Sequence, residues 1–228
     1  MLEFIHENLW IAKKPMDILG LDFGTVMTIV RMSNGNLFVH SPIEPGEELV
    51  RQINSIGPVE VVVSPNNFHH HYILDFLEYT PDCDYFYAPG LEKKLKNIPD
   101  SLNCRRKLSP FGSTPWDKDI EHLHISGMPF LDEYVFYHRD SKTLIASDLL
   151  IDIENCDHKF SRLLYSVLGV KGNGPGQSRL FKSCIRDKEE YNSAIERLGE
   201  WDINKMIVNQ GGVINIDQQD LVPRLIAV

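Results

Sequence analysis

The stretch VVVSPNNFHHHYILDF, residues 61–76, joins an apolar run, a polar turn and the start of an amphipathic segment. Its three valines are β-branched and uninterrupted by polar residues, which is typical of a strand covered on both faces. Ser64 and Pro65 end this run, three histidines follow at 69–71, and residues 73–77 carry apolar side chains at helical spacing. The stretch therefore predicts a strand–loop–helix unit with polar side chains at the end of the strand.

The three histidines have two interpretations. Adjacent residues on a helix point about 100° apart, so at most two of the three imidazoles can converge on one ion. The start of a helix disfavours positive charge, which keeps imidazoles neutral and able to bind a metal. Neutral imidazoles serve equally well as hydrogen-bonding groups at a helix entrance. The stretch alone leaves open both a metal site and a polar helix entrance.

The rest of the first half alternates strand and helix patterns with short connections. The dipeptide Asn34-Gly35 separates two apolar, β-branched runs and is a strong signal for a tight hairpin. The expected strands are 25–33, 37–42, 59–65 and 84–90, and the expected helices are 45–57, a segment that Pro81 ends, and the basic segment 91–97. This order predicts a mostly parallel sheet with helices packed on it.

The second half is more irregular. Residues 97–118 show little periodicity and are expected to form a long surface loop. Strands are expected at 120–128, 133–138 and 143–150, and the turn 139–142 joins the last two as a hairpin. The C-terminal third is expected to be mostly helical, with one late strand at 205–210 and a helix capped by Asp157. No linker divides the chain, so residues 1–228 are expected to form a single domain.

Composition narrows the class of protein. The chain has 228 residues, 43% of them hydrophobic and 24% charged, and a net charge of −9. That charge argues against a nucleic-acid partner, since nucleic-acid surfaces need clustered Lys and Arg. No apolar run is long enough to span a membrane, and Glu3 and Glu7 are out of place in a secretory signal. We expect a cytoplasmic protein with no nucleic-acid or membrane partner, whose four cysteines, which form no CxxC pair, stay reduced.

Several short patterns favour structural roles. His122 and His124 share one face of an expected strand, a spacing that can hold a metal but is more often incidental. The glycine-rich segment GNGPG at 172–176 lacks the Lys-Ser or Lys-Thr that a phosphate-binding loop requires. No GxSxG motif of a serine hydrolase occurs.

Polar residues also follow three expected strands, at their ends. In α/β proteins, sites are built from the loops that leave strand ends, so these residues are expected to share one polar pocket. The residues are Ser64, Asn67, His69, His70, Asp148, Asn209 and Gln210.

The arrangement resembles the metallo-β-lactamase fold superfamily. That family's first metal motif, HxHxDH, follows an apolar strand and opens a helix, as SPNNFHH does here. The later segments SGMP at 126–129, LIASDLL around Asp148 and IVNQGGVI around Gln210 fall where the family places its other ligands. The resemblance implies an α/β fold, a four-layer αβ/βα sandwich with mixed sheets. The segments LFVHSP, APGLEKK and GMPFLDEYVFYH resemble, more narrowly, a branch of unknown function.

The metal positions depart from the family pattern. The residues at the seven positions are Pro65, Asn67, His69, His70, Met128, Asp148 and Gln210. By the resemblance, His70 and Asp148 keep the family identity, and His69 replaces an aspartate. Proline offers no side-chain ligand, a thioether suits zinc hydrolysis poorly, and the two amides are weak oxygen donors. The resemblance therefore predicts a degenerate site instead of a dinuclear zinc centre.

Three functional hypotheses follow, and whether the chain is an enzyme stays open. The preferred hypothesis is a module that binds a ligand or a protein and has lost dinuclear zinc hydrolysis. A small molecule is its possible ligand, and its pocket is expected to be lined by Ser64, Asn67, Met128, Glu133 and Gln210. The alternative is a mononuclear hydrolase of an ester, thioester or lactam. Zinc, iron or manganese would be held there by His70 and Asp148, with His69 as third ligand or general base and Asp132 or Glu133 in support. The third is metal-free acid–base catalysis by His69 with Asp148.

Overall fold

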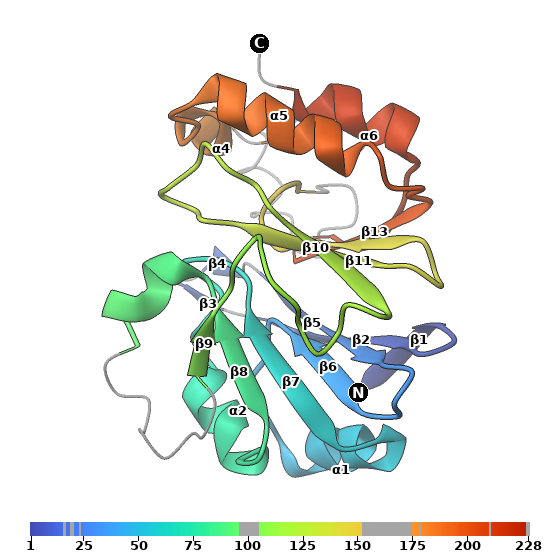
Figure 1. The fold of residues 1–228 in the computed structure, drawn as a ribbon. Coiled ribbons are helices and arrows are strands. Elements are labelled where there is room, and N and C mark those ends of the chain that lie inside the picture. The colour runs from blue at the N-terminus through green and yellow to red at the C-terminus, as the bar shows by residue number, and fades with distance from the viewer. Residues whose placement is uncertain are drawn as a thin grey trace.

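The protein forms four layers, two helical and two of sheet, as Figure 1 shows. This computed structural model describes residues 1–15, 17–18, 21–22, 24–95, 105–151, 175–177, 179–209 and 211–226. The two sheets lie face to face in the middle, and the helices cover their outer faces. This is the α/β sandwich with two mixed sheets that the sequence predicts.

The first sheet has seven strands in the order β1-β2-β5-β6-β7-β8-β9. They are β1 Leu2–His6, β2 Leu9–Lys14, β5 Thr25–Arg31, β6 Leu37–His40, β7 Val59–Ser64, β8 Asp84–Tyr87 and β9 Arg105–Lys107. The first four pair antiparallel and the last four, from β6 on, pair parallel. Two short strands, β3 Asp17–Ile18 and β4 Leu21–Asp22, pair with each other separately.

The second sheet has five strands in sequence order. They are β10 Ile120–His124, β11 Tyr134–His138, β12 Thr143–Ile145, β13 Lys205–Val208 and β14 Gly212–Asn215. Among these described strands, only the β12–β13 pair is parallel, and the other three pairs are antiparallel.

The helices flank the two sheets (Figure 1). Those of the first half are α1 Glu47–Ile56, α2 Ile73–Tyr79 and the 3₁₀ helix η1 Pro89–Lys93, and those of the C-terminal part are α4 Arg179–Ser183, α5 Lys188–Leu198 and α6 Gln218–Leu225. Asp187 and Asp217 cap α5 and α6 by accepting backbone N–H groups in the first turn. Among the described helices, none is long and apolar enough to cross a membrane.

Strand β7 shows how the sequence pattern builds the layers. Val61 and Val63 face the second sheet, in a core layer that includes Trp116 and Phe136. Val62 points to the opposite face, where α1 and α2 cover the sheet. A strand buried on both faces needs apolar residues at every position, which explains the unbroken valines.

The structure corrects five expectations. The first sheet is not mostly parallel, because the strands from β1 to β6 pair antiparallel and only those from β6 to β9 pair parallel. The histidines at 69–71 lie in turns, and α2 begins only at Ile73. The described part of the basic segment, residues 91–95, is not an α-helix: η1 is a short 3₁₀ helix that ends at Lys93 and has its proline in the first turn.

Within the expected loop 97–118, β9 adds an edge strand of exposed charges that has no apolar periodicity to reveal it. Strand β14 is a second late strand, where the sequence predicts only one, at 205–210. The helix expected after Asp157, residues 172–174 and Gln210 lie outside the described residues, and the single-domain boundary stays a prediction.

Candidate functional site

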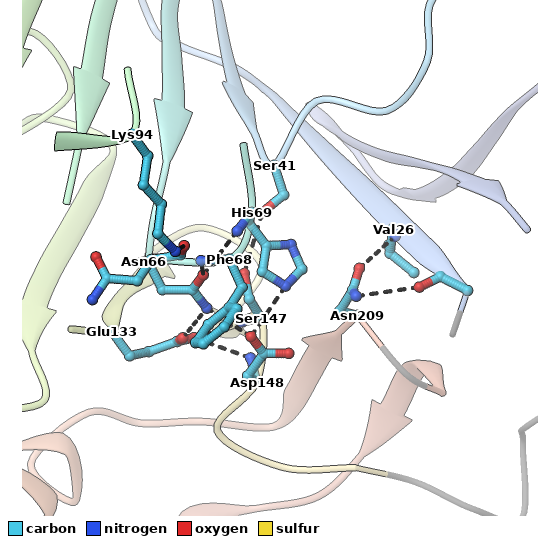
Figure 2. A network of polar contacts seen from close by, with 12 residues as sticks. Val26, Ser41, Asn66, Phe68, His69, Lys94, Glu133, Ser147, Asp148 and Asn209 are labelled. Carbon is cyan, nitrogen blue, oxygen red and sulfur yellow. Dashed lines mark hydrogen bonds and ion pairs between the residues drawn. The ribbon is translucent and has the colours of Figure 1, made fainter. Parts of the chain in front are cut away.

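Asn66 is the centre of a buried polar network in the loop after β7. Its side chain has no solvent exposure. The Asn66 amide Nδ2 donates to Glu133 Oε2 at 2.5 Å and to Asp148 Oδ2 at 2.8 Å. Its Oδ1 accepts the backbone N–H groups of Phe68 at 2.8 Å and His69 at 3.0 Å. One amide thus fixes two carboxyl groups and the loop that carries the histidines (Figure 2).

His69 and Asp148 form the more exposed part of this network. His69 Nε2 lies 3.2 Å from Asp148 Oδ2, and the two side chains are 11% and 27% exposed. His69 comes from the loop after β7, and Asp148 from the bend after β12. The pair therefore joins the ends of two strands from different sheets, which is where the sequence predicts a site.

Glu133 is the buried partner behind this pair. Its Oε1 accepts the backbone N–H groups of Ser147 at 2.8 Å and Asp148 at 3.2 Å. Burial, and then the negative charge of Asp148, raises the pKa of Glu133 to about 7. Burial opposes the ionisation of Asp148, but the charge of His69 and hydrogen bonds from His69 and Asn66 outweigh it, so the pKa of Asp148 is lowered.

The pKa of His69 is raised, because the charge and hydrogen bond of Asp148 outweigh the effect of burial. Near neutral pH, Asp148 is therefore the ionised carboxylate and pairs with His69. Glu133 is the carboxyl group of the two that retains a proton longer as the pH rises. The different surroundings of the two carboxyl groups therefore shift their pKa values in opposite directions.

Glu133 gives the protein a pH-dependent stability that can be measured. A carboxyl group with a raised pKa in the folded state stabilises the fold below its unfolded pKa, here 4.5, and that contribution is lost as the pH rises to about 7. Between pH 5 and 8, we expect the wild-type free energy of unfolding to fall by about 2 to 3 kcal/mol relative to Glu133→Gln. Chemical denaturation across this range measures both curves. Parallel curves would contradict the assignment of the proton to Glu133.

Other residues of the predicted pocket make their contacts elsewhere. Ser64 is buried and accepts a hydrogen bond from the Tyr85 hydroxyl at 3.0 Å. Asn67 Nδ2 donates to the Phe130 carbonyl at 3.0 Å, and Met128 is packed in the apolar core of the second sheet. The structure brings His69, Asp148 and Glu133 together. Ser64, Asn67 and Met128 take no part in the contacts among those residues.

Two further polar residues of the prediction stabilise strand ends. Asn209 accepts the N–H of Val26 at 2.8 Å and donates to the Gly24 carbonyl at 3.2 Å, as Figure 2 shows. Asp132 accepts from His124 at 2.9 Å and from the Gly90 N–H at 2.8 Å. Asn209 therefore connects the two sheets, and Asp132 connects β10 to η1.

His70 follows His69 in the loop after β7, and Asp148 forms its ion pair with His69 instead of His70. Its Nδ1 is buried and has no hydrogen-bond partner among the described residues. Burial, and then the neighbouring charges of His71 and Lys94, lowers the pKa of His70 to about 4, so this imidazole is neutral at pH 7. Its ring stacks on His71 with centroids 5.2 Å apart.

The donor set does not fit a dinuclear zinc centre. Zinc is bound in proteins by His, Cys and carboxylate side chains, normally at least three to an ion. In the part of the chain that the structure describes, no three such side chains are placed to hold a metal. Pro65 offers no side-chain ligand, and Met128 is buried among apolar residues. Asn67 donates to backbone carbonyls through Nδ2 and could offer a metal only its neutral amide oxygen, a weak ligand for zinc.

Asn66 is the site residue that sequence reasoning misses. The family pattern directs attention to the adjacent Asn67, which occupies a metal position. The available signal is the Asn-Asn pair after Ser64-Pro65, because Asn side chains commonly accept backbone N–H groups two or three residues ahead. Asn66 does this with Phe68 and His69.

The whole fold is that of the metallo-β-lactamases. The metallo-β-lactamase from Pontibacter korlensis is 19% identical, with 97% of this chain and 94% of that chain covered and a TM-score of 0.63. The DIM-1 metallo-β-lactamase is 17% identical, with 99% and 95% covered and a TM-score of 0.67. FIM-1 from Pseudomonas aeruginosa, in its mono-zinc form, is 11% identical, with 99% and 93% covered and a TM-score of 0.64. At these identities the likeness shows the fold alone.

Within that fold, residues 6–179 match the family described as a domain of unknown function (DUF4336). The chain belongs to this family. No curated protein matches the sequence significantly.

Proposed function

We propose that this protein is a metallo-β-lactamase-fold binding module, which takes a small polar ligand at the His69–Asp148 pair and does not carry out dinuclear zinc hydrolysis. The observation that carries the proposal is the position of the Asn66 amide, which donates to both carboxyl groups of the network. The imidazole and the carboxylate are thereby held in fixed positions with part of their surface exposed. Such a pair can donate and accept hydrogen bonds to a polar ligand.

The same contacts oppose metal binding. A zinc ion between His69 and Asp148 would replace their 3.2 Å contact and still have two strong protein ligands where three are normal. Glu133 already accepts two backbone N–H groups through Oε1 and the Asn66 amide through Oε2, and turning its carboxylate toward zinc as the third ligand would draw it away from these donors. Leaving those buried donors without partners costs about 1 to 3 kcal/mol each.

Turnover assays test this proposal. Purified protein is incubated with a chromogenic cephalosporin, p-nitrophenyl acetate and a thioester, each with added zinc and each with a chelator. We expect that added zinc does not raise the rate of hydrolysis of any of these substrates and that the chelator does not lower it. The matched variant is Asp148→Asn, which keeps the shape of the site and removes the carboxylate. Chelator-sensitive hydrolysis that Asp148→Asn abolishes would overturn the proposal.

One observation favours a second candidate, a mononuclear metal hydrolase. The neutral His70 imidazole has a buried Nδ1 without a partner among the described residues, which is a state suited to a metal ligand. In this candidate, His70 and Asp148 hold zinc, iron or manganese, and His69 is a third ligand or the general base. His70→Ala would then remove both the bound metal and esterase, thioesterase or lactamase activity. Unchanged metal content and activity in that variant would exclude this candidate.

A further inference from the structure

Two polar side chains that take no part in the hydrogen bonds of the Asn66 network lie side by side between the sheets. Thr28 on β5 and His40 on β6 are directly paired across the antiparallel ladder, so their side chains point to the same face. Each is 1% exposed. Among the described residues, no hydrogen-bond partner is present for Thr28 Oγ1 or for either ring nitrogen of His40.

The residues that pack directly against Thr28 and His40 in the first sheet are apolar. Along the first sheet, Thr28 is flanked by Ile11 on β2, and His40 is flanked by Val63 on β7. Across the gap between the sheets, the ring of Phe136 meets the His40 imidazole edge-on, with centroids 5.4 Å apart. In its own sheet Phe136 pairs with Ile145 on β12 and with His122 on β10, whose ring stacks on it with centroids 6.1 Å apart.

Unpaired polar atoms in such a layer need an explanation. The great majority of buried polar side-chain atoms bond to protein or to ordered water. Burial, and then the charge of His69, lowers the pKa of His40 to about 3, so its ring is neutral at pH 7. A neutral imidazole offers one donor and one acceptor, and the Thr28 hydroxyl offers one donor and acceptor lone pairs. This combination can donate one hydrogen bond to a neutral hydroxyl group and accept one from it.

We infer that Thr28 and His40 form a buried hydrogen-bonding site for one neutral hydroxyl group, which belongs to a water molecule or to a small hydroxylated ligand. The site lies behind the His69–Asp148 pair: Ser41, the residue after His40, contacts Ser147 through their hydroxyl groups at 3.2 Å, and Ser147 precedes Asp148. It is independent of the proposed function, because it needs no occupant at His69 and Asp148. A failure of ligand binding there would leave this site unaffected.

Paired substitutions test this inference. Thr28→Val removes the hydroxyl and keeps the shape, and His40→Phe keeps a flat ring against Phe136. If the site holds a shared hydroxyl, each single variant is expected to lower Tm by about 3 °C, and the double variant by less than the sum, since both partners of the occupant are then gone. If each single variant keeps or raises Tm and the change in the double variant equals the sum of the two, the inference is overturned. Thr28 and His40 would then be buried without a bound hydroxyl group.

Nitrogen NMR of the wild-type protein provides a readout that does not depend on how the variants fold. One ¹⁵N shift of the His40 ring is expected to be that of a hydrogen-bonded nitrogen, and shifts of two free nitrogens would overturn the inference. The source of the hydroxyl follows from unfolding the protein in guanidinium, dialysing it and refolding it. An unchanged Tm assigns the hydroxyl to water. A lower Tm that returns with the dialysed small-molecule fraction assigns it to a ligand.

Discussion

Asn66→Ala is expected to lower the free energy of unfolding by about 3 to 5 kcal/mol, because it removes the amide that serves both carboxyl groups. Glu133, which is fully buried, and Asp148 would then face each other with one fewer donor. The N–H groups of Phe68 and His69 would lose their acceptor at the same time. Equilibrium unfolding in urea measures the loss. It corresponds to a fall in Tm of about 10 °C or more for a chain of this size.

Asn36→Ala is the matched control for this experiment. Asn36 also donates through Nδ2 to a glutamate, Glu60, at 2.9 Å, but near the surface, where water can replace the bond. The control is expected to cost about 1 kcal/mol or less. Equal losses in the two variants would show that Asn66 contributes no more than an ordinary surface asparagine, against the role assigned to it.

Gly127→Ala is expected to cost about 4 kcal/mol and to lower Tm by about 10 °C. Gly127 has φ +78°, a conformation that alanine adopts with strain. A Cβ there would lie 2.2 Å from the Asp187 carbonyl oxygen and 2.9 Å from the Tyr191 nitrogen, and backbone atoms at the start of α5 cannot easily move. The Gly127 carbonyl also accepts the N–H groups of Arg186 and Asp187. The loop before Met128 is therefore packed directly on α5.

Gly112→Ala separates the two causes. Gly112 has φ +102°, but a Cβ there would meet nothing within 4 Å. It therefore carries the conformational strain without the clash, and we expect a loss of about 1 kcal/mol. Thermal unfolding of the two variants side by side measures the difference. A Gly127→Ala protein as stable as Gly112→Ala would contradict the close packing of this loop on α5.

The fold was predictable wherever local chemistry and burial agree. The Asn34-Gly35 turn has Gly35 at φ +88° and joins β5 and β6 as an antiparallel hairpin, as expected. The unbroken valines of β7 fill two core layers. Strand β9 was not predictable, since its three charged residues form a strand only by pairing with β8. Its conformation is imposed by the sheet edge and has no counterpart in its own pattern.

The site was predictable in part, for a comparable reason. Both His69 and Asp148 follow the end of a predicted strand, where sites in α/β proteins are built, and the resemblance places both at one site, so their proximity was predictable. The orientation of each side chain does not follow. Met128 turns into the core, and Asn66 instead of Asn67 reaches the carboxyl groups. Gln210 lies outside the described residues, and the cytoplasmic location and the excluded partners rest on composition and stay predictions.

Zinc content after loading is the most direct test of the central claim, that this site is not a zinc hydrolase centre. Protein purified without chelators is incubated with excess zinc, desalted and analysed by elemental mass spectrometry, with His70→Ala and Asp148→Asn in parallel. The donor set predicts well below one zinc per chain, with the same residual content in all three proteins. One or two zinc ions per chain, lost in either variant, would contradict it.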